Sequence, residues 1–200
     1  MDMLSINAAP PLRREASRGP GEVGVWLLVG GELAMFTTLF GAFVVVWSQH
    51  AADFRSAADT SITIGVLNTV VLLTSSVAVA GGVHAARAGQ LEAARRYVLA
   101  AAVLGGLFLA FKAVEYGIEI QHGWTPATNS FWMYYYAITG LHAVHVVMGL
   151  GGLVFAIRCL RGPTAYSARA VQYVESSATY WHMVDVLWIV IFPLVYLAAR

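Results

Sequence analysis

The chain has 200 residues, of which 58% are apolar and only 12% are charged, and its formal net charge is +1. Together with a mean hydropathy of +0.67, this excludes a water-soluble domain, because such domains carry about 25% charged residues. The near-neutral charge also excludes nucleic acid as a partner, since that would require a concentrated basic face. The single cysteine, Cys159, excludes an intramolecular disulfide and a cysteine-held iron–sulfur cluster. The composition therefore predicts an integral membrane protein.

The N-terminal segment differs from the rest of the chain. Residues 1–21 contain prolines and arginines without an apolar run, which predicts a mobile cytoplasmic tail. Residues 22–200 form one transmembrane domain with apolar segments at about 23–47, 62–86, 97–120, 131–160 and 173–198. Each can cross a hydrocarbon core of about 30 Å at about 1.5 Å per residue. Since unpaired strand backbone cannot face lipid, we expect an all-α bundle of five transmembrane helices.

Basic residues are distributed unevenly between the two sets of connections. Most arginines lie in the tail, in 87–96 and in 161–172 with the adjoining helix ends, whereas Arg55 and Arg200 lie on the other side. Lysine and arginine are retained on the cytoplasmic side of a membrane. The asymmetry predicts a cytoplasmic N-terminus and a periplasmic C-terminus in a bacterial-type inner membrane.

Small residues recur at spacings that suit close helix packing. They are Ala101 with Gly105, Ala102 with Gly106, and the cluster of Gly149, Gly151 and Gly152. Small residues four apart let two helix backbones approach closely. We expect helix contacts along such positions, although the sequence does not decide which pairs make them.

Ionisable side chains occur inside the predicted spans, where each is costly unless it is paired. This candidate polar seam consists of Glu32, Lys112, Glu115, His142, His145, Glu175, His182 and Asp185. Lys112 and Glu115 are three residues apart on one helix face, which predicts local neutralisation of the lysine. Glu32 has no basic residue within one helical turn, so we expect it to be protonated or hydrogen-bonded to another helix.

The polar residues of this seam are compatible with three functions: holding the helices together, handling protons, or binding a cofactor. Helical rise places Glu32 and His182 both about 14 Å from the cytoplasmic edge, and helix tilt would bring Glu115 towards His142 and His145. A haem held by His142 and His182 is a further hypothesis, because imidazole is a common axial ligand. Each histidine nevertheless has a carboxylate available as a hydrogen-bond partner. We therefore expect no haem, metal or catalytic residue in this chain.

Five sequence strings resemble, in family order, subunit III of the haem-copper respiratory oxidases. They are GVWLLVGGELAMFTTLFGAF around Glu32, LNTVVLLTSS at 67–76, FKAVEY at 111–116, TGLHAVHVVMG at 139–149 and YWHMVDVLWIVIFPLVY at 180–196. The chain resembles the short five-helix form of the family, which lacks the first two of seven helices. The segment NSFWMYYYAITGLHAVH is similar to the branch that includes nitric-oxide-reductase accessory proteins.

The resemblance implies a non-redox subunit beside the catalytic subunit I, together with subunit II, in a cytochrome c or quinol oxidase of aerobic respiration. It implies that the chain stabilises subunit I and supports its proton uptake, while haem and copper belong to the partner subunits. Glu32 falls on the family's intramembrane glutamate. The family's other polar positions correspond to Glu115, His142, His145, Glu175, His182, Asp185 and Trp188. Bound phospholipid and other membrane lipids are expected at the subunit interface.

Two alternatives stay open at this point. An accessory subunit of a nitric oxide reductase would serve denitrification rather than oxygen respiration. An autonomous membrane redox protein or transporter would hold a cofactor or substrate in the isolated chain. The electron donor, cytochrome c or quinol, is recognised by other subunits, so these residues do not reveal it.

Overall fold

The computed structural model describes residues 23–161 and 167–197. Within these ranges, the helices long and apolar enough to cross a membrane are α1 (Val23–Gln49), α3 (Ile62–Arg87), α4 (Leu91–Gln121), α5 (Ser130–Cys159) and α6 (Ala168–Phe192). A π-helical turn, η2 (Pro193–Leu197), continues α6. The predicted all-α bundle of five transmembrane helices is confirmed, and none of the described residues lies in a strand. The predicted tail, residues 1–21, lies outside the described residues.

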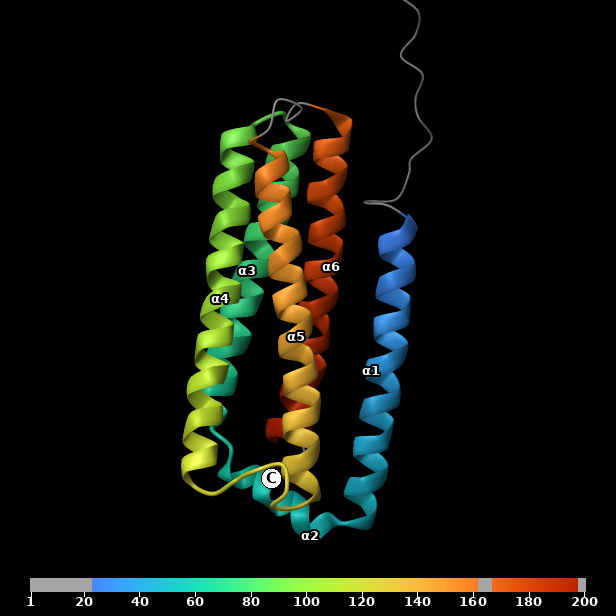
Figure 1. Ribbon diagram of the computed structural model, residues 1–200, viewed down its shortest axis with the longest axis vertical. Helices are drawn as coiled ribbons and strands as arrows, with labels where there is room; N and C mark the ends of the chain where they lie inside the picture. The colour runs from blue at the N-terminus through green and yellow to red at the C-terminus, as the bar shows by residue number, and fades with distance from the viewer. Residues whose placement is uncertain (1–22, 162–166, 198–200) are drawn as a thin grey trace, which may run out of the picture.

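Four of the long helices form a ring, and the fifth lies outside it. In the ring, α3, α4, α5 and α6 pack as antiparallel neighbours, while α1 lies against α6 and α5 (Figure 1). Short helices α2 (Ala51–Phe54) and η1 (Arg55–Asp59) cross the end of the bundle between α1 and α3. Phe54 is buried there, and its ring contacts the rings of Phe43, Trp47 and Phe131. These contacts fix the connection to the bundle.

Two helices begin before their apolar segments do. Helix α4 begins at Leu91 and α6 at Ala168, whereas hydropathy places the spans from about 97 and 173. In α4, the carboxylate of Glu92 pairs with Arg95 and Arg96 at distances of 2.8 and 3.4 Å. Such i, i+3 and i, i+4 pairs stabilise a helix in the polar interface. Hydropathy therefore marks the part of each helix inside the hydrocarbon, not the end of the helix.

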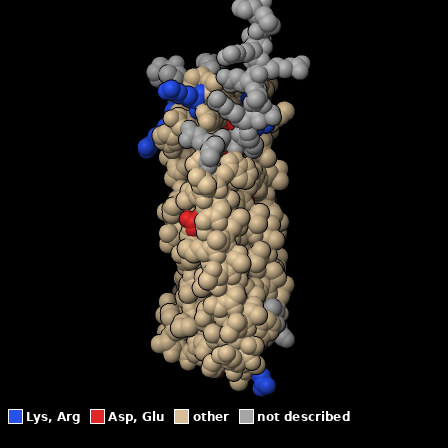
Figure 2. Space-filling model, turned by 90° about the vertical axis from the view of Figure 1, so that its right-hand side faces the viewer, with Lys and Arg blue, Asp and Glu red and all other residues tan. Residues whose placement is uncertain are grey.

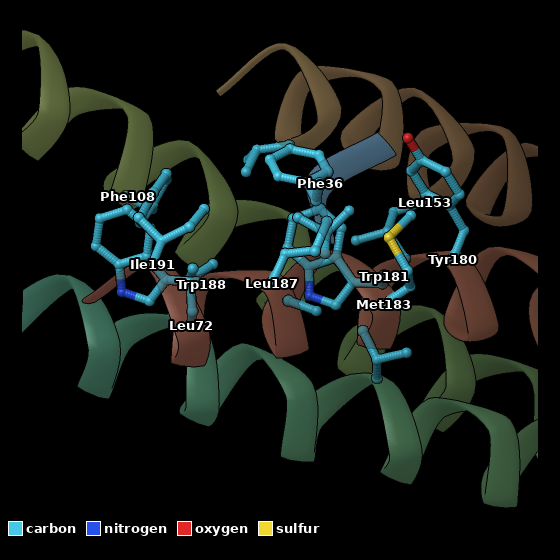
Figure 3. Packing of buried hydrophobic residues seen from close by; sticks show 14 of the residues in the cluster. Phe36, Leu72, Phe108, Leu153, Tyr180, Trp181, Met183, Leu187, Trp188 and Ile191 are labelled. Atoms are coloured by element: carbon cyan, nitrogen blue, oxygen red, sulfur yellow. The ribbon is translucent and has the colours of Figure 1, made fainter. Parts of the chain in front are cut away.

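Trp181 of α6 occupies the middle of the ring. A Cβ atom added at Gly105 of α4 would lie 2.4 Å from this indole, and one added at Gly149 of α5 would lie 2.8 Å from it. The indole Nε1 donates a hydrogen bond to Ser75 Oγ, which in turn donates to the Ala101 carbonyl oxygen, each at 3.0 Å. Figure 3 shows Trp181 and Trp188 among the buried side chains of the core. Glycines thus make room for a large aromatic side chain, as close packing in a membrane requires.

The small residues of α4 divide between two faces. Ala101 and Gly105 are buried in the ring, whereas Gly106 is exposed, and a Cβ there would meet nothing within 4 Å. On α5, Gly149 contacts Trp181, but Gly151 likewise faces open space. Only some of the small-residue positions therefore make the expected helix contacts.

Helix α1 packs through a regular seam. Its buried residues Val29, Phe36 and Phe43 recur every seven positions, as in a coiled-coil interface. The ring of Phe36 meets the edge of His145 of α5, with centroids 5.3 Å apart. The remaining surface of α1 is largely exposed, which suits a helix surrounded by lipid or by another subunit.

The outer surface carries the signature of a membrane protein. Figure 2 shows blue basic side chains gathered at one end, which we call the basic end, and below it a long tan band in which a red acidic spot is visible. Large apolar side chains such as Leu27, Val77 and Val103 are 74%, 72% and 64% exposed. Surface of this kind is stable only in contact with lipid or with other membrane-embedded protein. The chain is therefore a multi-pass membrane protein.

The packing of Trp181 predicts different effects for two neighbouring glycines. Gly105→Ala should lower the free energy of unfolding by about 1–3 kcal/mol, because the added methyl group overlaps the indole. Gly106→Ala is the matched control and should be neutral or slightly stabilising, since alanine favours helix more than glycine. Thermal unfolding of both variants in detergent measures the difference. Equal losses of unfolding free energy in the two variants would contradict the close packing of Trp181 against Gly105.

Membrane orientation stays a prediction from the arginine asymmetry. Ala88 and Ala127 are exposed at opposite ends of the bundle. In a Cys159→Ala background, Ala88→Cys should react with a membrane-impermeant reagent only from the cytoplasmic side and Ala127→Cys only from the periplasm. Labelling of both from one side would refute the topology, and the reverse pattern would refute the orientation.

Candidate functional site

A buried lysine organises the largest polar cluster of the bundle. This lysine cluster consists of Lys112 and Glu115 of α4, Tyr135 of α5 and Tyr196 of η2, all of them buried. Lys112 Nζ donates to Glu115 Oε2 at 3.0 Å, to the Tyr196 hydroxyl at 3.0 Å and to the Tyr135 hydroxyl at 3.2 Å. The Tyr196 hydroxyl donates to Glu115 Oε1 at 2.7 Å. An ammonium group has three donors, so every one is used, and the predicted neutralisation of Lys112 by Glu115 is confirmed.

Aromatic rings surround the same ammonium group. Lys112 Nζ lies 4.8 Å from the ring centroids of Tyr116 and Tyr135, 5.7 Å from that of Tyr196 and 5.8 Å from that of Trp188. The negative face of an aromatic ring attracts a cation, most strongly where water is excluded. The lysine cluster therefore joins α4, α5 and the end of α6 through a charge that water does not reach.

A second polar contact ties α1 to the ring. Glu32 Oε2 lies 2.8 Å from His145 Nε2, and His145 Nδ1 lies 2.7 Å from the Leu141 carbonyl oxygen. A carbonyl oxygen only accepts, so Nδ1 carries a proton and donates to it. The remaining proton is shared between Nε2 and the Glu32 carboxyl, either as an ion pair or as two neutral groups. The side chain of Glu32 is 16% exposed, so the contact lies at the edge of the bundle.

The polar residues of α6 meet α3. His182 Nδ1 lies 2.6 Å from Ser76 Oγ, and Arg87 Nε donates to Glu175 Oε1 at 2.7 Å near the basic end. Asp185 is buried one turn beyond His182, and its carboxyl group lies near the Ser76 hydroxyl that His182 also contacts. A buried carboxylate without a cationic partner is costly, so we expect Asp185 to be protonated or to be satisfied by water.

His142 is completely buried and lies between aromatic rings. Its ring centroid is 5.6 Å from that of Phe108 and 5.3 Å from that of Trp188. Neither ring nitrogen has a hydrogen-bond partner among the described residues. The prediction that helix tilt brings Glu115 towards His142 and His145 was wrong, because Glu115 bonds to Lys112 and Tyr196 instead.

Similar depth allowed Glu32 to meet His182, but no hydrogen bond joins the two side chains. Both lie at similar depth, but His182 faces α3 while Glu32 faces α5. Depth along a helix therefore does not determine which neighbour a side chain reaches. The seam consists of separate clusters: the lysine cluster, the Glu32–His145 contact, the Ser76–His182 contact, the Arg87–Glu175 pair, and the buried residues His142 and Asp185.

Sequence reasoning missed the partners that carry hydroxyl groups. Tyr135 and Tyr196 lie near helix ends, where tyrosine usually marks the membrane interface, yet both turn inward to Lys112. Nothing in the sequence singled out Ser76 as the partner of His182, because serine is common in membrane helices. Asn68 is also buried, and its amide has no partner among the described residues. A buried lysine with one carboxylate still has two donors to satisfy, and this requirement is the signal that could have led to the tyrosines.

The histidines are arranged poorly for metal or haem binding. Both nitrogens of His145 are engaged by Glu32 and Leu141, and His142 is enclosed by Phe108 and Trp188. Across residues 23–161 and 167–197, no three His, Cys, Asp or Glu side chains gather as metal ligands would. That the chain holds no haem or metal of its own stays a prediction.

The lysine cluster predicts strong coupling between its two charges. Lys112→Met should lower the free energy of unfolding by roughly 3–5 kcal/mol, because it leaves Glu115 buried and unpaired. The double variant Lys112→Met/Glu115→Leu should recover most of that loss, since it removes both charges. Thermal unfolding in detergent measures both. A double variant as unstable as the single one would contradict the pairing.

Comparisons with known proteins agree with this architecture. The family model for cytochrome c oxidase subunit III matches residues 17–199. The chain is 32% identical over 179 residues to cytochrome c oxidase subunit 3 of Alkalihalophilus pseudofirmus, a match that covers 88% of this chain and 85% of that protein. It is 29% identical over 178 residues to cytochrome c oxidase subunit 3 of Thermostichus vulcanus, covering 89% and 87%. It is 28% identical over 195 residues to quinol oxidase subunit 3 of Bacillus subtilis, covering 96% and 94%.

These matches confirm the resemblance drawn from the five sequence strings and extend over nearly the whole chain. They imply association with the catalytic subunits of a respiratory oxidase in a bacterial-type membrane. With its five spanning helices, the chain belongs to the cytochrome c oxidase subunit III family, the subunit III of the haem-copper oxidases.

Proposed function

We propose that the chain is a non-redox subunit that stabilises the catalytic subunit I of a haem-copper terminal oxidase and supports its proton uptake. The observation that carries this proposal is the internal pairing of charges. Lys112 is satisfied by Glu115 and two tyrosines, and Glu32 is bonded to His145. Groups that neutralise one another in this way hold helices in a fixed arrangement, which is what a scaffold beside a catalytic subunit needs.

Support for proton uptake is proposed to be indirect. The lysine cluster lies about 14 Å from the outer end of α4, whereas His145 lies about 22 Å from the outer end of α5 by helical rise. Among the described residues, no hydrogen bond links the two clusters. This separation favours a subunit that keeps the partner's proton entry intact over one that conducts protons through its own helices.

The proposed complex assigns the redox groups to other subunits. Haem and copper are proposed to belong to subunit I and its neighbour subunit II, because His142 is enclosed by aromatic rings and both His145 and His182 are hydrogen-bonded. Relatives include subunits of both cytochrome c oxidases and quinol oxidases. The electron donor is therefore set elsewhere in the complex. Phospholipid is expected where this chain meets its partners.

Neutralising the buried carboxylates tests the stabilising role. Glu115→Gln and Glu32→Gln should lower the fraction of purified complex that retains this subunit, while the oxygen turnover of intact complexes stays near the wild-type value. Asp59→Asn is the matched control, because Asp59 is an exposed carboxylate outside the spanning helices. Quantitative gel analysis and oxygen consumption in proteoliposomes give the two measurements.

Other outcomes would assign a different function. Normal retention with strongly reduced proton uptake in Glu32→Gln would make the seam a proton path. A stoichiometric Soret band in the isolated chain that disappears in His142→Ala or His182→Ala would make it a redox protein. Co-purification with an enzyme that reduces nitric oxide but not oxygen would favour the denitrification alternative.

A further inference from the structure

A small pocket at the basic end lies between the start of α4 and the end of α5, two neighbours in the ring (Figure 1). Its volume is about 80 Å³, and it is lined by Glu92, Arg95, Arg96, Leu99, Ile157 and Arg161. A water molecule takes up about 30 Å³ in the liquid, so the pocket has room for a group the size of a phosphate.

The charges that line this pocket favour an anion. Three guanidinium groups face one carboxylate, and Glu92 already pairs with Arg95 and Arg96. Two positive charges remain without a counterion in the pocket lining. The Nε of Arg95 is buried and has no hydrogen-bond partner among the described residues. A buried donor left unsatisfied is costly, and an anionic oxygen would satisfy it.

The surroundings of the pocket favour a lipid over a free anion. Leu99 and Ile157 lie on the side of the arginines that faces the membrane interior, and Leu99 is 51% exposed. Exposed apolar surface continues deeper along the same helices at Val103 and Val154, which are 64% and 42% exposed. Positive charge directly above apolar surface matches a headgroup followed by its acyl chain. Basic pockets between helices at the cytoplasmic face are typical sites for anionic lipid headgroups.

We propose that this pocket binds the phosphate of an anionic phospholipid through Arg95, Arg96 and Arg161, with an acyl chain along Leu99 and Ile157. A zwitterionic lipid binds less well, because its own ammonium group meets the guanidinium groups. Glu92 weakens the site, because its carboxylate competes with the phosphate for Arg95 and Arg96. The site does not depend on which oxidase the chain joins.

The test uses the full-length chain in phosphatidylcholine nanodiscs, titrated with phosphatidylglycerol and followed by native mass spectrometry. Arg95→Gln and Arg161→Gln should each weaken phosphatidylglycerol binding by about fivefold, the effect of one arginine near a membrane surface. Glu92→Gln should strengthen binding, and this opposite sign separates electrostatics from damage to the fold. Arg158→Gln is the matched control, because Arg158 is exposed at the same end but outside the pocket.

Four results would overturn the proposal. An equal loss in Arg158→Gln would indicate a general basic surface instead of a site. Competition by inorganic phosphate at matched concentration would indicate a free-anion site. Unchanged lipid binding in Arg161→Gln, with loss of the oxidase subunits from the purified complex, would assign the pocket to an acidic segment of a partner. Weaker lipid binding in Glu92→Gln would exclude competition between the Glu92 carboxylate and the lipid phosphate for Arg95 and Arg96. Should Arg95→Gln fail to fold, Arg161→Gln and Glu92→Gln still decide the question.

Discussion

A charge inside a bilayer has to be neutralised by the protein itself, and this constraint shapes the whole bundle. Lys112 meets it by using all three of its ammonium donors on Glu115, Tyr135 and Tyr196. To do so, α4, α5 and the end of α6 must lie at one particular height and rotation. The ion pair contributes little net stability by itself, because desolvation offsets the attraction. Its larger effect is to disfavour other arrangements, since each of them would leave a charge unpaired.

The apolar contacts follow a different rule, because lipid already solvates apolar side chains. Helices in a bilayer associate where small residues allow close approach, and here the space opposite Gly105 and Gly149 is filled by Trp181. The indole also donates to Ser75 on a third helix. The Trp181 side chain therefore contributes both close packing and a hydrogen bond between helices. In α1, by contrast, the Glu32–His145 contact lies near the edge, and α1 is the least buried of the spanning helices that the structure describes, so much of its surface is left for lipid or a partner.

The parts of the fold that could be predicted are those encoded within a single helix. Span number follows from hydropathy, and the Lys112–Glu115 pair follows from a three-residue spacing. Contacts between helices could not be predicted, because they depend on the rotation of each helix about its axis. His142 and His145 are only three residues apart, yet one faces Phe108 and Trp188 while the other faces Glu32. Family resemblance pointed to these polar positions as a set, but a shared position does not reveal a bonding partner.

The order in which the partners of Lys112 follow one another along the chain has a consequence for biogenesis. A chain is made from its N-terminus, so α4 is synthesised before η2, and at that moment Glu115 is the carboxylate partner that Lys112 carries on its own helix. The local pair lowers the cost of placing a lysine in the membrane, and Tyr135 and then Tyr196 complete its coordination as later segments follow. The order of synthesis is therefore also the order in which the charge is shielded.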